Sequence, residues 1–142
     1  MSVIAPTEVA TRLIESFNAG DWDAFRADVA DDVVYVEAGT GRRIEGADAY
    51  LELCRGWRAA FSDVRGTVQR SLEGGDVSAL EVTWEGTHDG PLATPGGTIP
   101  ASGRRATMQA TLWTEIRGGL VAEVHHHLDV MALMTQIGAL ES

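Results

Sequence analysis

Apolar residues recur at every third or fourth position in three stretches of the chain, which is the spacing of a buried helical face. The first stretch starts at Pro6, which suits the first turn of a helix, and stops before Gly20, so it predicts a helix over residues 6–18. Asp21 is placed to cap a second, shorter helix. The third stretch predicts a long, well-buried helix over residues 50–61.

The second half of the chain changes to the alternating or continuous apolar patterns typical of strands. Strands are predicted at residues 33–37, 64–72, 77–87, 104–117 and 120–129, and the glycines at positions 39, 41 and 46 indicate a loop over residues 39–46. Glycine-containing turns at residues 73–76 and 118–119 favour antiparallel hairpins. Residues 89–103 contain three prolines and are expected to form a long irregular loop over a sheet edge or a pocket mouth, and residues 130–136 a short final helix.

Helices followed by an antiparallel meander describe the α+β class. The curved, mixed or antiparallel sheet is expected to wrap around the N-terminal helices as a cone-shaped barrel whose interior is partly core and partly cavity. The length suits one ordinary domain, and no repeat or linker divides the chain, so we expect a single domain over residues 1–142.

Charge and cysteine content narrow the function classes. Eleven basic and twenty-one acidic residues give a net charge of −10, which argues against nucleic-acid binding and against a membrane-surface role. The single cysteine, Cys54, excludes an internal disulfide and a thiolate zinc cluster. No segment is apolar for long enough to suggest a membrane helix, and the start resembles neither a signal nor a transit peptide, so a cytoplasmic location is expected.

The titratable residues gather in the last predicted strand. Alternation along a strand places His125, His127 and Asp129 on one face, and Val124, His126 and Leu128 on the other. We interpret the first face as the floor of a small-molecule pocket and His126 as a partly buried interface histidine. His125, His127 and Asp129 would also suit zinc or iron, but all three ligands come from one strand, so no metal site is predicted.

Several short segments, in this order, resemble the SnoaL-like polyketide cyclase (ester cyclase) family of the nuclear transport factor 2-like superfamily. They are residues 17–21, 60–63, 84–88 and 103–104, and Asp129 followed by residues 136–138. The resemblance covers nearly the whole chain. It implies a deep hydrophobic cavity, no cofactor, and a homodimer or homotetramer.

The resemblance also implies catalytic roles. Asp129 stands where the cyclases carry the acid/base of an intramolecular aldol closure; the alternative is that it caps the helix after it. The cyclases carry Gln-x-His on the preceding strand, where this chain has Gln109 and Thr111. Gln109 is therefore a candidate donor to the substrate, and His125 and His127 are candidate replacements for the missing histidine.

The remaining predicted substrate contacts come from alternation and from the aromatic residues. Thr111 and Trp113 share the face of Gln109, which lines the cavity or faces water, while Met108, Leu112 and Ile116 occupy the other face. Other candidate contacts, which are alternatively plain core or loop residues, are Tyr35, Trp57, Phe61, Trp84, His88 and Met131.

These features predict an enzyme that needs no cofactor and acts on a small hydrophobic or aromatic, polyketide-like carbonyl compound by acid/base-catalysed aldol cyclisation or a related isomerisation. The alternatives are a hydroxylase or epoxide hydrolase using the same cavity, and a non-catalytic binding or assembly module. A dimer is expected because the apolar face of Met108, Leu112, Ile116, Val124 and Leu128 needs a cover, which helices or a second subunit would provide.

Overall fold

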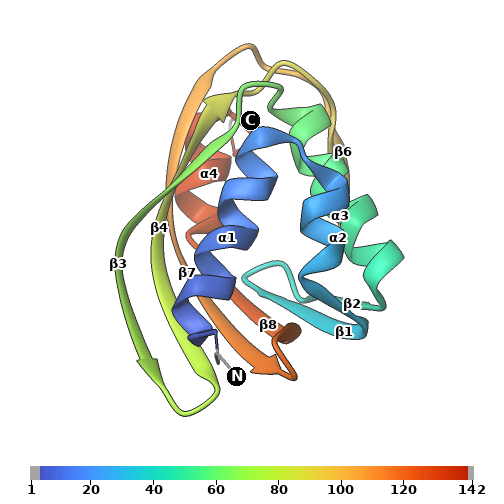
Figure 1. Cartoon of the computed structure of the whole chain (residues 1–142). Coiled ribbons are helices and arrows are strands. Elements are labelled where there is room, and N and C mark those ends of the chain that lie inside the picture. The colour runs from blue at the N-terminus through green and yellow to red at the C-terminus, as the bar shows by residue number, and fades with distance from the viewer. Residues whose placement is uncertain (1–3, 141–142) are drawn as a thin grey trace.

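In the computed structural model, which describes residues 4–140, helices cover the concave face of a curved sheet (Figure 1). The helices are α1 (Pro6–Ala19), α2 (Trp22–Ala27), α3 (Ala47–Ala60) and α4 (Val130–Gln136). The strands are β1 (Val29–Ala38), β2 (Arg42–Glu45), β3 (Arg65–Gly74), β4 (Val77–Thr87), β5 (Leu92–Thr94), β6 (Gly97–Ile99), β7 (Arg105–Arg117) and β8 (Leu120–Leu128). The predicted α+β class is confirmed.

The main sheet has six strands in the order β2-β1-β8-β7-β4-β3. All neighbours are antiparallel except β1 and β8, which pair in parallel and bring the first strand beside the last. This parallel pair makes the sheet mixed. Strands β5 and β6 form a separate two-stranded hairpin.

Local sequence explains where the first helices begin and end. Gly20 closes α1 with φ +67°, a left-handed conformation that glycine adopts without strain, and its N–H donates to the carbonyl of Phe17. The carboxylate of Asp21 accepts a hydrogen bond from the N–H of Ala24 at 3.1 Å, so the predicted cap of α2 is confirmed.

Two regions differ from the sequence predictions. Residues 39–46 were expected to form a loop, but β2 pairs there with β1, and β1 itself starts at Val29 rather than at residue 33. The expected irregular loop at residues 89–103 contains the β5–β6 hairpin. Strands of three or four residues between glycines and prolines are too short to show an alternating pattern, which explains both errors.

The core lies between the helices and the concave face of the sheet. It includes Leu13 and Phe25 from the helices, and Leu112 and Val124 from β7 and β8. The apolar face that the sequence left uncovered is therefore covered by helices of the same chain. It gives no argument for a second subunit.

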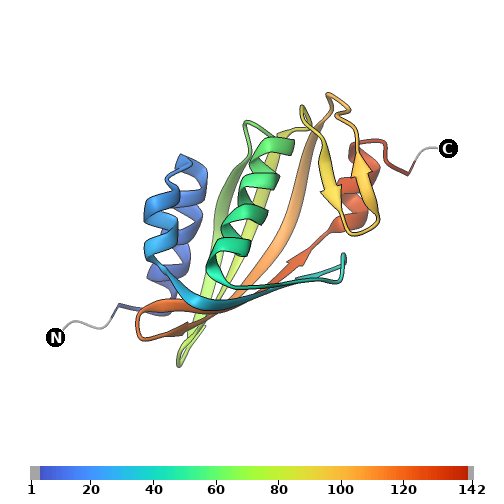
Figure 2. The same ribbon diagram turned by 90° about the vertical axis from the view of Figure 1, so that its right-hand side faces the viewer.

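The β5–β6 hairpin lies beside α4, at the end of the molecule away from α1 and α2, and the β1–β2 turn extends toward it (Figure 2). Its base is fixed to the end of α3, where the backbone N–H groups of Asp89 and Gly90 both donate to the carbonyl of Ala60. A Cβ at Gly90 would lie 2.1 Å from the carbonyl oxygen of Ala59, so only glycine fits this approach. The hairpin also buries Leu92.

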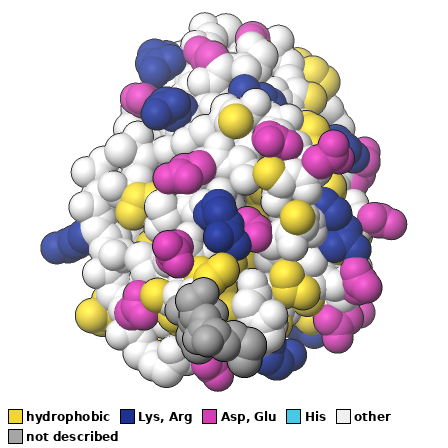
Figure 3. Space-filling model, viewed as in Figure 1, with side chains coloured by type: hydrophobic (Ala, Val, Ile, Leu, Met, Phe, Trp, Pro, Cys, Tyr) yellow, Lys and Arg dark blue, Asp and Glu magenta, His cyan; other side chains and the backbone are white. Residues whose placement is uncertain are grey.

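The surface seen from the side of α1 and α2 carries interspersed acidic and arginine side chains without an extended positive patch (Figure 3). That distribution agrees with the net charge of −10. Among the described residues, no helix has the length and apolar character needed to cross a membrane.

Candidate active site

A small cavity lies between the helices and the concave face of the sheet. Its volume is about 80 Å³, well below the ~300 Å³ of a small ligand pocket. Apolar and aromatic side chains form most of its wall, among them Leu13, Phe25, Trp57, Phe61, Met108 and Leu112. The cavity therefore suits an apolar or aromatic molecule rather than a charged one.

Three of the lining side chains carry polar atoms that contact one another: Tyr35, Trp84 and His126. The indole N–H of Trp84 points at Nε2 of His126 over 3.3 Å. An indole nitrogen only donates, so Nε2 is the acceptor and the neutral ring carries its proton on Nδ1. Nδ1–H then donates to the hydroxyl of Tyr35 at 2.8 Å.

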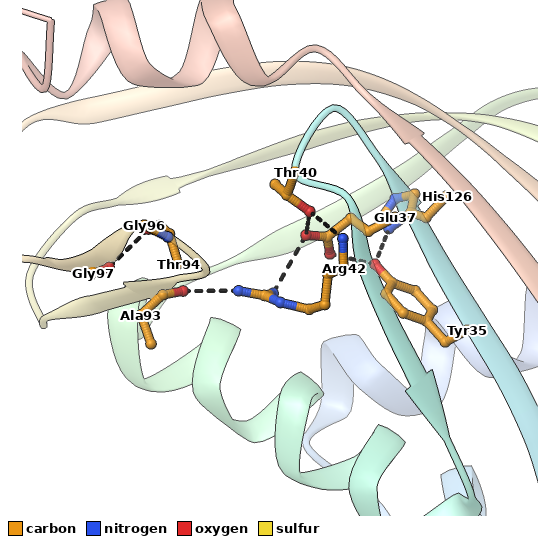
Figure 4. Close-up of polar contacts among 9 residues, drawn as sticks. All are labelled: Tyr35, Glu37, Thr40, Arg42, Ala93, Thr94, Gly96, Gly97 and His126. Atoms are coloured by element: carbon orange, nitrogen blue, oxygen red, sulfur yellow. Dashed lines mark hydrogen bonds and ion pairs between the residues drawn. The ribbon is translucent and has the colours of Figure 1, made fainter.

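This polar chain continues to a buried carboxylate. The hydroxyl of Tyr35 donates to Glu37 Oε2 at 2.6 Å, and the side chain of Glu37 is fully buried. The other oxygen, Oε1, accepts from the hydroxyl of Thr40 at 2.7 Å and lies 3.3 Å from the guanidinium of Arg42 (Figure 4). An isolated buried carboxylate would be costly, and these three partners satisfy it.

Burial sets the protonation states within this chain. Burial, together with the smaller effect of the neighbouring His127, lowers the pKa of His126 from 6.5 to about 3, so His126 is neutral near pH 7. Burial, reinforced by the negative charge of Glu37, raises the pKa of Tyr35 well above its usual value, so the phenol keeps its proton. Burial also raises the pKa of the Cys54 thiol, which lines the same cavity. The cavity thus contains an unprotonated imidazole nitrogen beside neutral donors.

Residues 7–137 match the sequence pattern of the SnoaL-like polyketide cyclase family. The chain belongs to this family. Since the match covers almost every helix and strand, the predicted family is confirmed.

Three solved structures have the same fold as this chain. A proposed SnoaL-like polyketide cyclase from Jannaschia sp. CCS1 superposes with a TM-score of 0.85 at 22% identity, covering 98% of this chain and 96% of that chain. IdmH, a proposed polyketide cyclase from Streptomyces antibioticus, gives a TM-score of 0.78 at 27% identity, covering 94% and 98%. A proposed ketosteroid isomerase from Kribbella flavida DSM 17836 gives 0.67 at 24% identity, covering 87% and 76%. Among curated proteins there is no match.

Of the catalytic residues predicted for this SnoaL-like chain, none lines the cavity. His125 and His127 point to the convex face of the sheet, where His125 Nε2 lies 2.9 Å from Glu123 and His127 is exposed. Gln109 is exposed on the same face and accepts from Thr83. Alternation grouped these side chains correctly, but the apolar set, which contains His126, is the one that faces inward, because hydrophobic burial decides which face packs against the helices.

Asp129 is exposed and acts as the cap of α4, accepting from the N–H of Ala132 at 3.1 Å. This is the alternative role that the sequence left open. The carboxylate lies outside the lining of the cavity, since β8 has already ended at Leu128. A catalytic role for Asp129 gains no support from this position.

The predicted substrate contacts divide into two groups. Tyr35, Trp57, Phe61 and Trp84 line the cavity, and their binding role stays a prediction. Four others lie outside the cavity lining: Thr111 and Trp113 on the convex face, the exposed Met131 on α4, and the buried His88.

His88 has a place in the core rather than in the cavity wall. Its ring stacks on Phe61 with centroids 5.2 Å apart, and Nδ1 accepts from the backbone N–H of Ser102 at 3.2 Å. The hydrogen bond to a loop residue is the ordinary structural role considered for His88. Burial lowers the pKa of His88.

The sequence did not reveal the buried carboxylate or the role of His126. Glu37 is the last residue of the predicted strand, where an acidic side chain is expected to be exposed. Only the pairing of β1 with β2 places Arg42 opposite it. One signal was present: Val33, Tyr35 and Glu37 alternate, so a buried Tyr35 implies a buried Glu37. For His126, the signal was that it shares a face of the strand with the apolar Val124 and Leu128, because apolar faces pack inward.

On the convex face, the side chains of Glu115, Glu123 and His125 lie close enough together to hold a cation, with ligand atoms within 4.8 Å of one another. They differ from the His125, His127 and Asp129 set considered from the sequence. The contact between His125 and Glu123 is accounted for by their hydrogen bond. Each side chain is half-buried, and none of them faces the cavity.

Proposed function

We propose that this SnoaL-like protein is an enzyme that needs no cofactor, and that it removes a proton beside the carbonyl group of a small apolar or aromatic compound bound in the cavity. The enolate formed in this way then attacks a second carbonyl of the same molecule in an aldol cyclisation, or is reprotonated at another carbon in an isomerisation. The observation that carries this proposal is the pairing of the His126 acceptor with the Trp84 donor inside an apolar cavity.

The two nitrogen atoms match the two needs of a ketone. The carbonyl oxygen needs a donor and the adjacent C–H needs a base, and these groups lie on neighbouring carbons. The Trp84 Nε1 to His126 Nε2 distance of 3.3 Å is long for a hydrogen bond. A carbonyl compound inserted here would accept from the indole N–H while its α-hydrogen faces Nε2.

The polar chain stabilises the charge that the transfer produces. As Nε2 takes the α-proton, the C–H electrons form the enolate and the carbonyl oxygen gains negative charge next to the Trp84 N–H. The imidazole ring becomes positive and donates through Nδ1–H to Tyr35, which is in turn bonded to the Glu37 carboxylate. The low pKa of free His126 means that the base is unprotonated at neutral pH, and the enolate charge beside it favours the imidazolium.

Family membership and fold support this class of chemistry. IdmH, at 27% identity, is named as a proposed polyketide cyclase, and an enolate is the intermediate expected of an aldol closure. The apolar lining supports a neutral aromatic substrate, as predicted from the sequence.

The proposal is tested with 2-indanone, a neutral bicyclic ketone, by following exchange of its α-protons in D₂O by NMR. His126→Gln should lower the enzyme-catalysed exchange rate by about 10²- to 10⁴-fold, the usual contribution of a positioned acid/base. The matched control is His127→Gln, the adjacent exposed histidine on the convex face. Exchange that survives in His126→Gln, or a wild-type rate no higher than that of buffer, would refute the proposal.

A further inference from the structure

The side chain of Arg42 joins two parts of the molecule that share no strand pairing. Its NH1 nitrogen lies 3.3 Å from Glu37 Oε1, and its NH2 nitrogen donates to the carbonyl of Ala93 at 3.0 Å (Figure 4). Glu37 belongs to β1 of the main sheet, whereas Ala93 belongs to β5 of the separate hairpin. One guanidinium therefore bridges the buried end of the polar chain and the backbone of the hairpin.

The hairpin packs behind the wall of the cavity on the side of α4. Leu92 and Ile99 pack with Phe61, Met108 and Leu133, three residues that line the cavity. Beyond the hairpin, between residues 94–100 and 134–140, lies a wider groove of about 590 Å³. The hairpin thus lies between the apolar cluster beside the cavity and an open groove.

With a volume of about 80 Å³, the cavity is too small for a bicyclic or larger substrate. Such a substrate requires part of the wall to move. The hairpin lies behind this wall and is attached outside the main sheet: it forms its own two-stranded sheet, and its base is held by the bonds of Asp89 and Gly90 to Ala60. Its far end is held by Arg42.

We propose that Arg42 is a positioning residue that couples the position of the β5–β6 hairpin to the alignment of Glu37, Tyr35 and His126. With the hairpin in the position seen here, Ala93 holds the guanidinium against Glu37, which fixes the carboxylate that orients Tyr35 and, through it, the His126 ring. With the hairpin displaced, the guanidinium loses one of its two attachments and the chain relaxes. The effect of this coupling on catalysis rests on the proposed function. The coupling itself is a property of the protein without substrate.

Arginine is suited to this position in a way that lysine is not. Its planar group offers several N–H donors in fixed directions, so it can bind a carboxylate and a carbonyl at once. A lysine ammonium can still pair with Glu37 but cannot reach both partners from one point. Arg42→Lys therefore keeps the charge next to the buried carboxylate and removes the bridge.

The chain offers a matched control in the adjacent arginine. Arg43 lies on the other face of β2, is largely exposed, and pairs only with Glu45 among the described residues. Arg43→Lys makes the same chemical change one position away without touching Glu37 or Ala93.

The first measurement is hydrogen exchange of the backbone amides of residues 92–99 by mass spectrometry. Arg42→Lys should speed their exchange by about threefold to tenfold, which corresponds to the loss of one partly exposed hydrogen bond. Arg43→Lys should leave the rate unchanged. Unchanged exchange in Arg42→Lys would overturn the proposal.

The second measurement reads the coupling directly from the ¹⁵N NMR signals of His126. Leu92→Ala loosens the hairpin by removing a buried anchor and should shift these signals in the wild-type background. In the Arg42→Lys background the same change should leave them in place, since the bridge is gone. Equal shifts in both backgrounds would show that the hairpin acts on His126 by another route and would overturn the proposal.

Both measurements are made without substrate. Failure of 2-indanone exchange would therefore refute the proposed chemistry and leave the coupling intact, and the reverse outcome would refute the coupling alone.

Discussion

Replacing His126 with glutamine should change how the stability of the protein depends on pH. The folded state holds His126 with a pKa of about 3, against 6.5 in its ordinary surroundings. The folded protein therefore binds fewer protons than the unfolded chain between these values, and the free energy of unfolding falls as the pH falls from 6.5 toward 3. Above pH 6.5 the imidazole is neutral in both states and costs nothing.

The size of this effect follows from the two pKa values. Each tenfold change in proton affinity is worth about 1.4 kcal/mol, so the full loss approaches about 5 kcal/mol near pH 3. At pH 5, 1.5 pH units below the ordinary value, His126 alone should cost the wild-type protein about 2 kcal/mol relative to pH 7.5. Glutamine fills similar space and cannot titrate, so His126→Gln should lack this part of the pH dependence.

The measurement is urea unfolding followed by tryptophan fluorescence at pH 7.5, 6 and 5. The difference between wild type and His126→Gln isolates His126, because the other buried histidine, His88, whose pKa is also lowered, contributes equally to both proteins. His127→Gln serves as the control and should keep most of the wild-type pH dependence, because burial is the main cause of the low pKa of His126. Parallel pH profiles for wild type and His126→Gln would show that His126 is not held neutral by burial.

Three further outcomes are expected. Asp129→Ala should lower the free energy of unfolding by about 1 kcal/mol, the value of a lost helix cap, and leave 2-indanone exchange near the wild-type rate, whereas a large loss of exchange would restore Asp129 as the acid/base. Tyr35→Phe should reduce exchange while the cavity still binds the ketone, measured by quenching of Trp84 and Trp57 fluorescence; an unchanged rate would separate Glu37 from the chemistry. The homodimer or homotetramer predicted from the sequence is expected to use the convex face, where Trp113 is 43% exposed, so Trp113→Glu should give a monomer by light scattering, and a monomeric wild type at micromolar concentration would contradict it.

Periodicity predicted most of the fold because long helices and strands bury one face each. The helix at Pro6–Ala19 and the strands at Val77–Thr87 and Arg105–Arg117 lie within two residues of their predicted positions. β2 and the β5–β6 hairpin escaped prediction because three or four residues show no period, and their pairing depends on contacts with distant parts of the chain.

The candidate site was predicted less well than the fold. Alternation in β8 separated His126 from His125 and His127, yet the polar set was assigned to the pocket on the expectation that catalytic groups gather there. In the structure the inward face is the apolar one, and a single histidine enters the cavity with it. The energy of burying Val124 and Leu128 determines that orientation, and titratable neighbours do not change it.

The rate at which Cys54 reacts with a thiol reagent would measure how often the interior of the protein becomes accessible. The thiol lies in the wall of the cavity and is buried, and burial raises its pKa, so little reactive thiolate is present. Because it is the only cysteine in the chain, a thiol reagent such as a maleimide modifies one known position. The rate of that modification reports how often the wall parts, and a bound ligand that fills the cavity would slow it.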